Sequence, residues 1–414
     1  MGETGTGGYV FMSGMFRSGT TLLGTMLNAH PALAIALDPF LPVFKAFRSQ
    51  VAGGLPGGSP QAEIAAPLDD YYFLPHKQIV MDAVRTASLD LPIAPASVAE
   101  LEAQLAAYAA EYAPRLSTRL AGLGGKTYAQ ALAHGVGSIL DLYGGPECRL
   151  AGFKQAWTDE FAPHVLSAHP DNKVIHIIRD PRATCASKNV SEEKYPWLFL
   201  IRQWRKSASF IWRNVFGPGA DPGRVMLVRY EDLIAEPERE ARRICSFLGV
   251  GFDPRVVRPE GFTDSEGRPW VQNTSYQDAA RQVFNTGSIG KWRNILKPPE
   301  IELIERLCAA EMRAFGYAPG ISEDTRLPDA MVWDPPEVPD GSMAKWIRKY
   351  LRVDPDGRLQ EMALERWRGD ALAGGASAAG FPPPLKRLFA LDTAFFDALA
   401  GKASWNGPDG SGAA

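Results

Sequence analysis

Apolar and polar positions alternate along much of the chain with two different periods. Residues 9–13 (YVFMS) are β-branched and aromatic, and 20–29 carry apolar side chains at helical spacing, which predicts strand, turn and helix. Residues 173–178 (KVIHII) form a second, buried strand between two helical patterns. A third strand at 224–228 precedes an amphipathic helix at 237–248. This order predicts an α/β protein of three layers, in which helices flank both faces of a central parallel sheet.

The stretches between and after these elements indicate the domain organisation. Before residue 150, a Gly/Pro-rich stretch is followed by helical patterns, one of them opened by a capping box of Ser97 and Glu100. We therefore expect one domain over 1–319 with a helical insertion at about 48–150. Residues 320–414 carry helical patches between Pro/Gly-rich segments and end in a polar tail, which predicts a helical C-terminal extension.

Composition narrows the class of protein. Of the 414 residues, 45% are apolar and 22% charged, which is typical of a globular protein and disfavours disorder. A net charge of −3 without a long Lys/Arg run disfavours a nucleic-acid partner, so any anion site must be local. The four cysteines lack CxxC or Cys/His spacing and predict reduced thiols. Because the sequence has neither a leader pattern nor an apolar run of roughly 18 residues, we expect no transmembrane segment and a cytoplasmic location.

The segment 14–21 (GMFRSGTT) lies where the first predicted strand passes into a helix. Backbone N–H groups and the positive end of the helix dipole converge at such a place and bind anions. A Walker A loop has Lys after its second glycine, whereas here Thr20 follows Gly19 and the cation, Arg17, precedes it. A sulfuryl group carries less charge than a phosphoryl group, so its transfer can proceed without a metal, and we expect none. The alternative is that the glycines only shape a turn and Arg17 is a surface charge.

A second segment, 177–187 (IIRDPRATCAS), repeats this arrangement on another predicted strand. Arg179 comes just after the buried strand, at the edge where open α/β sheets bind ligands, and its planar guanidinium suits a phosphate. Two such sites on neighbouring strands predict an anion with two charged ends.

Together, FRSGTTLLGTMLNAHP and KVIHIIRDPRATCASKN resemble the 5′-phosphosulfate loop and the 3′-phosphate motif of sulfotransferases that use 3′-phosphoadenosine 5′-phosphosulfate (PAPS). The resemblance covers about residues 9–50 and 150–317 and is closest to the branch that includes tyrosylprotein sulfotransferases. It implies a P-loop-like fold, PAPS as co-substrate, and transfer of the sulfuryl group to a hydroxyl of an acceptor.

The resemblance also assigns roles to individual residues. The segment at 286–293 (TGSIGKWR) is similar to the family's closing segment over the 3′-phosphate and adenosine, and Asp180 and Arg182 are expected to hold a turn. The residues implied to bind PAPS are Arg17, Ser18, Gly19, Thr20 and Thr21 at the 5′-phosphosulfate, Arg179 and Ser187 at the 3′-phosphate, and Tyr230, Ser288 and Lys291 near the nucleotide.

Catalytic roles fall on two further positions. Lys154 stands at the place of the family's lysine, which with Arg17 stabilises charge on the departing oxygen, although Gln155-Ala156 replaces the family's Thr/Asp-Pro. Asp38, 21 residues after Arg17, is the implied general base in the position of a family glutamate. Its alternative is a turn carboxylate before a proline. The other candidates for the base are His30, His76 and His134, the first of which more often caps a helix.

The acceptor is left open by the sequence. A carbohydrate, a glycolipid or a secondary metabolite is favoured, with a protein tyrosine as the alternative. A P-loop nucleotide kinase and a non-catalytic nucleotide-binding protein are the rival functions. The aromatic residues Tyr71, Tyr72 and Phe73 suit either a stacking wall for the acceptor or the core, and the C-terminal helices suit either a cover over the acceptor or a homodimer contact.

Overall fold

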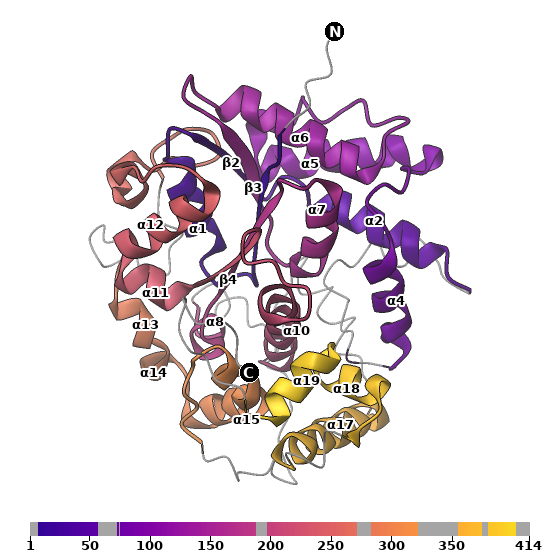
Figure 1. Cartoon of the computed structure of the whole chain (residues 1–414). Coiled ribbons are helices and arrows are strands. Elements are labelled where there is room, and N and C mark those ends of the chain that lie inside the picture. Colours follow the sequence, from indigo (N-terminus) through magenta and orange to yellow (C-terminus); the bar gives the residue numbers. More distant parts are fainter. Residues whose placement is uncertain are drawn as a thin grey trace. The chain divides into compact units, whose positions relative to one another are not determined.

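The computed structural model describes residues 7–56, 73, 75–187, 197–270, 283–321, 355–374 and 380–402. The chain divides into two compact units (Figure 1). The first unit combines Met1–Leu68, Ile79–Ile178 and Ala220–Asn285, and the second combines Asp69–Gln78, Arg179–Gly219 and Thr286–Ala414. The domain limits expected from the sequence stay predictions.

The first unit is built on a five-stranded sheet in the order β2-β3-β1-β4-β5. Every neighbouring pair of strands is parallel, and the central strand β1 pairs with β3 on one side and β4 on the other. The predicted parallel sheet is therefore confirmed. The strands are β1 (Val10–Ser13), β2 (Leu33–Leu37), β3 (Leu150–Lys154), β4 (Lys173–Ile178) and β5 (Val225–Arg229).

Two of these strands, β2 and β3, were not predicted from the sequence. β2 reads LAIAL and β3 reads LAGFK, and both contain alanine or glycine, which are weak strand formers. In the sheet the two strands pair with each other from Leu33 opposite Leu150 to Leu37 opposite Lys154. Pairing with neighbouring strands and burial of side chains thus stabilise β2 and β3, although their own sequences have a weak preference for strands.

Helices cover both faces of this sheet, as predicted. Figure 1 shows α1, α11 and α12 on one side and α2, α6 and α7 on the other. Helix α4 (Pro75–Thr86) runs from the second unit into the first. The remaining helices of the first unit are α1 (Thr20–Asn28), α2 (Leu41–Gly53), α5 (Val98–Tyr112), α6 (Tyr128–Tyr143), α7 (Ala162–Ala168), α11 (Tyr230–Ala235) and α12 (Pro237–Leu248).

The start of α5 shows where a local motif misled the sequence analysis. A helix begins after Ser97 as predicted, but the Ser97 side chain makes no capping hydrogen bond. Ser97 is the last residue of a 3₁₀ turn and has φ −101° and ψ −6°, outside the extended region from which a serine caps a helix. The capping box lies instead at α6, where Thr127 Oγ1 accepts from Gln130 N at 3.2 Å and Thr127 N donates to Gln130 Oε1 at 3.0 Å.

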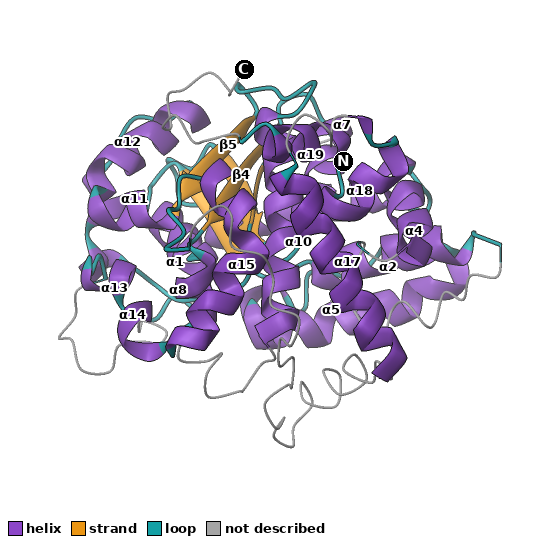
Figure 2. Cartoon of the chain, turned by 90° about the horizontal axis from the view of Figure 1, so that it is seen from below, coloured by secondary structure: helices purple, strands orange, loops and turns teal. Residues whose placement is uncertain are grey.

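The described part of the second unit is helical, whereas the strands belong to the first unit (Figure 2). Buried ion pairs connect its long helices, because Arg205 Nη1 lies 2.7 Å from Glu365 Oε2 and Arg368 pairs with Glu311. In the ranges that the structure describes, no helix has the length and apolar character needed to cross a membrane. The helices of this unit are α8 (Pro181–Cys185), α10 (Trp197–Phe216), α13 (Gly287–Gly290), α14 (Trp292–Ile295), α15 (Pro298–Ala314), α17 (Pro355–Ala373), α18 (Pro383–Ala390) and α19 (Thr393–Ala400).

Candidate active site

The candidate residues of the first unit gather at the carboxyl edge of the sheet. Arg17 lies in the loop between β1 and α1, Asp38 follows β2, Lys154 ends β3 and Tyr230 follows β5. Ligands of open α/β sheets bind at this edge. Because β2 and β3 are register partners at Leu37 and Lys154, the aspartate and the lysine are brought together although 116 residues separate them in sequence.

The loop after β1 is shaped by two glycines in tight surroundings. A Cβ atom on Gly14 would lie 2.2 Å from the carbonyl oxygen of Ile177, so a side chain there would push β4 away. Gly19 has φ +95°, and a Cβ atom on it would lie 2.5 Å from the ring of Tyr230. Tyr230 therefore packs against this loop, and both positions need glycine.

Helix α1 starts directly after Gly19, and no side chain caps it. The first N–H groups of a helix have no partner within the helix and attract anions. Thr20 is buried and Thr21 half-buried in this first turn. The hydroxyl of Ser18 is buried and donates to the carbonyl oxygen of Met15, so it stabilises the turn itself. The loop thus offers backbone N–H groups, with Arg17 half-buried beside them.

Three residues at this edge adopt a left-handed backbone that non-glycine residues rarely adopt. Arg17 has φ 65°, Asp38 φ 52° and Trp157 φ 64°. They follow β1, β2 and β3 in turn, and they are three of the five such residues in the described part of the chain. Backbone strain of about 1–3 kcal/mol per residue persists where the surroundings enforce it, and it gathers at functional sites. The backbone conformations therefore indicate a functional site at this edge of the sheet, independently of the sequence motifs.

Asp38 and Lys154 form an ion pair between the ends of β2 and β3. Lys154 Nζ contacts Asp38 Oδ2, and the lysine side chain is 2% exposed whereas that of the aspartate is 19% exposed. Asp38 Oδ1 also accepts from Ala156 N at 3.1 Å and from Gln155 Nε2 at 3.3 Å. The carboxylate is therefore oriented by three donors while part of it faces solvent.

Gln155, which replaces the family's Thr or Asp after the lysine, supports this carboxylate. It is buried, and its Oε1 accepts from Phe40 N at 2.9 Å while its Nε2 reaches Asp38. Asp38 N in turn donates to Lys154 O at 2.6 Å. Gln155, at which the chain departs from the family motif, thus holds the segment of Asp38 against the end of β3. The sequence alone showed this departure but indicated no role for Gln155.

Three histidines were alternatives for the general base. His30 lies before β2, at the amino end of the strand, whereas Asp38 lies at the carboxyl end. Its Nδ1 accepts from Ala32 N at 3.0 Å and its Nε2 lies 2.7 Å from Gly251 O, so both ring nitrogens are engaged. His134 is exposed on α6, and the side chain of His76 is outside the described residues. Its place at the carboxyl edge of the sheet therefore favours Asp38 over His30 as the general base.

The remaining candidates belong to the second unit. Arg179 directly follows β4 in sequence and is half-buried, and its carbonyl oxygen accepts from Trp204 Nε1 at 2.8 Å. Ser187 and Ser288 are buried, and Lys291 is half-buried between α13 and α14. These positions are compatible with ligand binding, but their role at a nucleotide stays a prediction.

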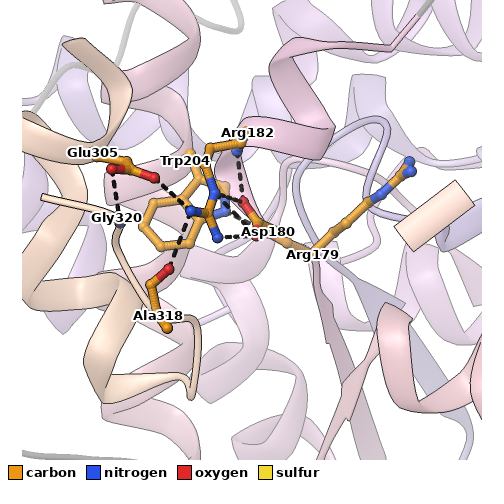
Figure 3. A network of polar contacts seen from close by, with 7 residues as sticks. All are labelled: Arg179, Asp180, Arg182, Trp204, Glu305, Ala318 and Gly320. Carbon is orange, nitrogen blue, oxygen red and sulfur yellow. Dashed lines mark hydrogen bonds and ion pairs between the residues drawn. The ribbon is translucent and has the colours of Figure 1, made fainter. Parts of the chain in front are cut away.

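Asp180 and Arg182 form a buried network within the second unit (Figure 3). Arg182 Nη2 lies 2.7 Å from Asp180 Oδ2, and Arg182 Nη1 lies 2.5 Å from Glu305 Oε1. Asp180 also caps α8 by accepting from Arg182 N at 2.8 Å. The Arg179 side chain points away from this network in Figure 3. The contacts of Asp180 and Arg182 agree with the turn-holding role expected from the sequence.

Comparison with known proteins places the chain in a family. The sequence matches the family model described as the sulfotransferase family over residues 10–254. This match spans more than half of the 414 residues, and the chain belongs to the sulfotransferase family.

Individual relatives are similar over part of their length. Human carbohydrate sulfotransferase 6 is 27% identical over 173 residues, which cover 37% of this chain and 43% of the relative. Protein-tyrosine sulfotransferase of Drosophila melanogaster is 25% identical over 241 residues, covering 56% of this chain and 48% of the relative. The chain thus spans less than half the length of these two relatives. The solved sulfotransferase domain from the Synechococcus PCC 7002 olefin synthase aligns over 72% of this chain and 93% of that one, with 21% identity and a TM-score of 0.41.

Proposed function

We propose that this chain is a PAPS-dependent sulfotransferase that passes the sulfuryl group to a hydroxyl of an acceptor. The observation that carries the proposal is the ion pair of Asp38 and Lys154 next to an uncapped helix N-terminus. The loop after β3 is tied to the loop after β1, because Trp157 N donates to Gly14 O at 3.0 Å. A base, a cation and an anion-binding loop therefore share one edge of the sheet.

The loop fits the phosphosulfate end of PAPS. The first turn of α1 presents backbone N–H groups, and Arg17 adds a positive charge beside them. PAPS supplies the sulfuryl group, and in-line transfer forms a bond between the acceptor oxygen and sulfur as adenosine 3′,5′-bisphosphate leaves. The loop N–H groups and Arg17 orient the sulfuryl group and stabilise its charge, which lowers the barrier mainly through positioning and electrostatics.

The two residues of the ion pair have separate roles in the reaction, one at the acceptor hydroxyl and one at the leaving oxygen. Asp38 accepts the proton of the attacking hydroxyl at its carboxylate, which its three donors hold in place. When Asp38 becomes neutral, Lys154 loses its counter-charge and its ammonium is available to the oxygen that leaves sulfur. Protonation of the base thereby coincides with release of the cation that stabilises the leaving group.

Arg179, Ser187, Ser288 and Lys291 stay proposals for the 3′-phosphate, and Tyr230 for the nucleotide. They rest on the family resemblance and on their positions after β4 and α8, in α13, between α13 and α14, and after β5. Calorimetric titration distinguishes this function from a kinase: adenosine 3′,5′-bisphosphate should bind, and Mg-ATP should not. Tight binding of Mg-ATP without binding of the bisphosphate would contradict the proposal.

For the acceptor we propose a carbohydrate, a glycolipid or a secondary metabolite. The similarity to human carbohydrate sulfotransferase 6 supports a carbohydrate, and that to the Drosophila protein-tyrosine sulfotransferase supports the alternative of a protein tyrosine. Intact-mass spectrometry of a panel of acceptors incubated with PAPS tests both. A mass increase of one sulfuryl group on any hydroxyl acceptor supports transfer, whereas PAPS left unconsumed with every acceptor favours a non-catalytic nucleotide-binding protein.

We also propose a cytoplasmic location, as expected in the sequence analysis, and a homodimer formed through the apolar C-terminal helices. Cell fractionation and analytical ultracentrifugation test them. Recovery in the membrane fraction, or a monomer at all concentrations, would contradict them.

A further inference from the structure

Two tyrosines on α5 lie next to the proposed base. Tyr108 and Tyr112 are four residues apart, so they share one side of the helix, and their ring centroids are 4.6 Å apart at an interplanar angle of 38°. Tyr108 is half-buried, and Tyr112 is 40% exposed at the end of the helix. The buried Leu101, Leu105 and Ala109 lie on this same side of α5 and fix it in the core. The aromatic pair is thus held by the fold while one of its rings faces solvent.

Gln155 connects this pair to the catalytic carboxylate. Its Nε2 lies 3.4 Å from the Tyr108 hydroxyl oxygen and 3.3 Å from Asp38 Oδ1. Burial, followed by the charge of Asp38, raises the pKa of the Tyr108 phenol, and burial is also the first cause that raises the pKa of Tyr112 to about 12. Both phenols therefore stay protonated near neutral pH. Since the Tyr108 oxygen accepts from Gln155, its own O–H can donate to another oxygen close to Asp38.

We propose that Tyr108 and Tyr112 form the acceptor-binding wall of the active site and that the acceptor they bind is a sugar ring. This inference rests on the sulfotransferase function proposed above and names its acceptor class. The exposed ring of Tyr112 stacks on the C–H face of the sugar, while the Tyr108 hydroxyl donates to the sugar hydroxyl that Asp38 deprotonates.

The polar groups along this wall favour a sugar over a simple phenol. The Asp38 carboxylate and the Tyr108 hydroxyl present hydrogen-bonding atoms close together, beside the exposed Tyr112 ring. A polyhydroxylated ring can pair with them, whereas a phenol with a single hydroxyl would leave buried polar groups unpaired, which costs affinity. Aromatic rings combined with a few fixed polar groups are typical of ligand sites.

The test uses the full chain and compares Tyr112→Ala with Tyr112→Phe, which keeps the ring. Methyl β-galactoside, methyl N-acetyl-β-glucosaminide and their disaccharide are the sugar probes, and 4-nitrophenol and a tyrosine peptide are the phenol probes. We expect Tyr112→Ala to raise the KM for the sugar about ten-fold, through loss of stacking, without changing the affinity for adenosine 3′,5′-bisphosphate. Tyr112→Phe should stay close to the wild type. Leu140→Ala, at an exposed apolar residue of α6, is the matched control and should change nothing.

A second readout does not depend on turnover. Saturation-transfer NMR of the sugars with protein loaded with adenosine 3′,5′-bisphosphate should show signal at the ring C–H protons, which Tyr112→Ala abolishes. An unchanged KM and unchanged NMR contacts in Tyr112→Ala, or transfer to the phenol probes with no sugar binding, would overturn the inference. If the loaded protein binds sugars through Tyr112 but never consumes PAPS, the proposed function fails while the sugar wall stands.

Discussion

Two carboxylate–cation pairs follow strands of the same sheet, and they differ in how firmly the cation is held. Among the described residues, the Lys154 ammonium contacts only Asp38, whose carboxylate is 19% exposed. Arg182, by contrast, binds Asp180 and Glu305, donates to Ala318 O at 3.1 Å, and stacks on Trp292 with 4.1 Å to the ring centroid. A cation with a single, partly exposed partner can change partner during a reaction, whereas one held on every side is structural. Variants of these residues and of Gln155 test this difference.

Removing the charge of Asp38 should have the largest effect on catalysis. Asp38→Asn keeps the shape of the side chain, and asparagine tolerates the left-handed backbone at φ 52°. We expect turnover to fall about 10³-fold because the base is lost, and the free energy of unfolding to fall as well because the buried Lys154 ammonium loses its counter-charge. Single-turnover transfer of sulfur-35 from PAPS measures this. Turnover within a few-fold of the wild type would exclude Asp38 as the base and return attention to His134.

Loss of the Lys154 ammonium should have the next largest effect. Lys154→Met keeps the apolar stem but removes the charge, and we expect turnover to fall 10²–10³-fold because the leaving oxygen loses its cation. The affinity for adenosine 3′,5′-bisphosphate, measured by calorimetry, should be retained. The double variant with Asp38→Asn should lose less than the sum of the two effects, since the two residues act as a unit. Strict additivity would contradict the partner exchange proposed for the lysine.

Arg182→Met should affect stability and leave the chemistry almost unchanged. It leaves the buried carboxylates of Asp180 and Glu305 without their cation, which costs about 3–5 kcal/mol of unfolding free energy. Denaturant unfolding of the whole chain gives this value, and Arg182→Lys, which keeps a charge, should lose less. If folded Arg182→Met lost turnover as severely as Lys154→Met, the contrast between the two pairs would be wrong.

Gln155→Ala should lower turnover less than the Asp38 and Lys154 variants and stability less than Arg182→Met. It removes the acceptor of Phe40 N and one donor to Asp38, so the base is less well oriented. We expect turnover to fall about ten-fold and stability by about 1–3 kcal/mol, because a buried backbone N–H loses its partner. Gln155→Glu keeps that acceptor but places a second carboxylate beside Asp38 Oδ1, so it too should lower stability, through like-charge repulsion. An unchanged kcat in Gln155→Ala would show that Ala156 N and Lys154 suffice to hold the carboxylate.

Much of the fold follows from the sequence, but the strands that carry the catalytic pair do not. β1, β4 and β5 contain the β-branched or aromatic residues that predict strands, whereas β2 and β3 contain alanine or glycine and depend on their neighbours. Asp38 and Lys154 were therefore proposed from their spacing to motifs in the chain, without the sheet register that explains why they meet.

The acceptor-binding wall of Tyr108 and Tyr112 could not have been found from the sequence either, because it too depends on the tertiary fold. Tyr108 and Tyr112 have ordinary helical spacing, and only the fold brings them to Gln155 and Asp38. The aromatic residues that did stand out in the sequence were Tyr71, Tyr72 and Phe73. The first two lie outside the described residues, and Phe73 is buried beneath the Arg205 guanidinium, 4.8 Å from the ring centroid. Phe73 thus belongs to the core, the second of the two uses considered for it.

The most direct test of the central claim is a single-turnover assay with sulfur-35 PAPS and a sugar acceptor, performed on the wild type and on Asp38→Asn. The wild type should form labelled product together with adenosine 3′,5′-bisphosphate, and Asp38→Asn should bind the bisphosphate equally well but form product about 10³-fold more slowly. Wild-type protein that binds the bisphosphate and leaves PAPS intact with every acceptor, or an Asp38→Asn variant as fast as the wild type, would contradict the account.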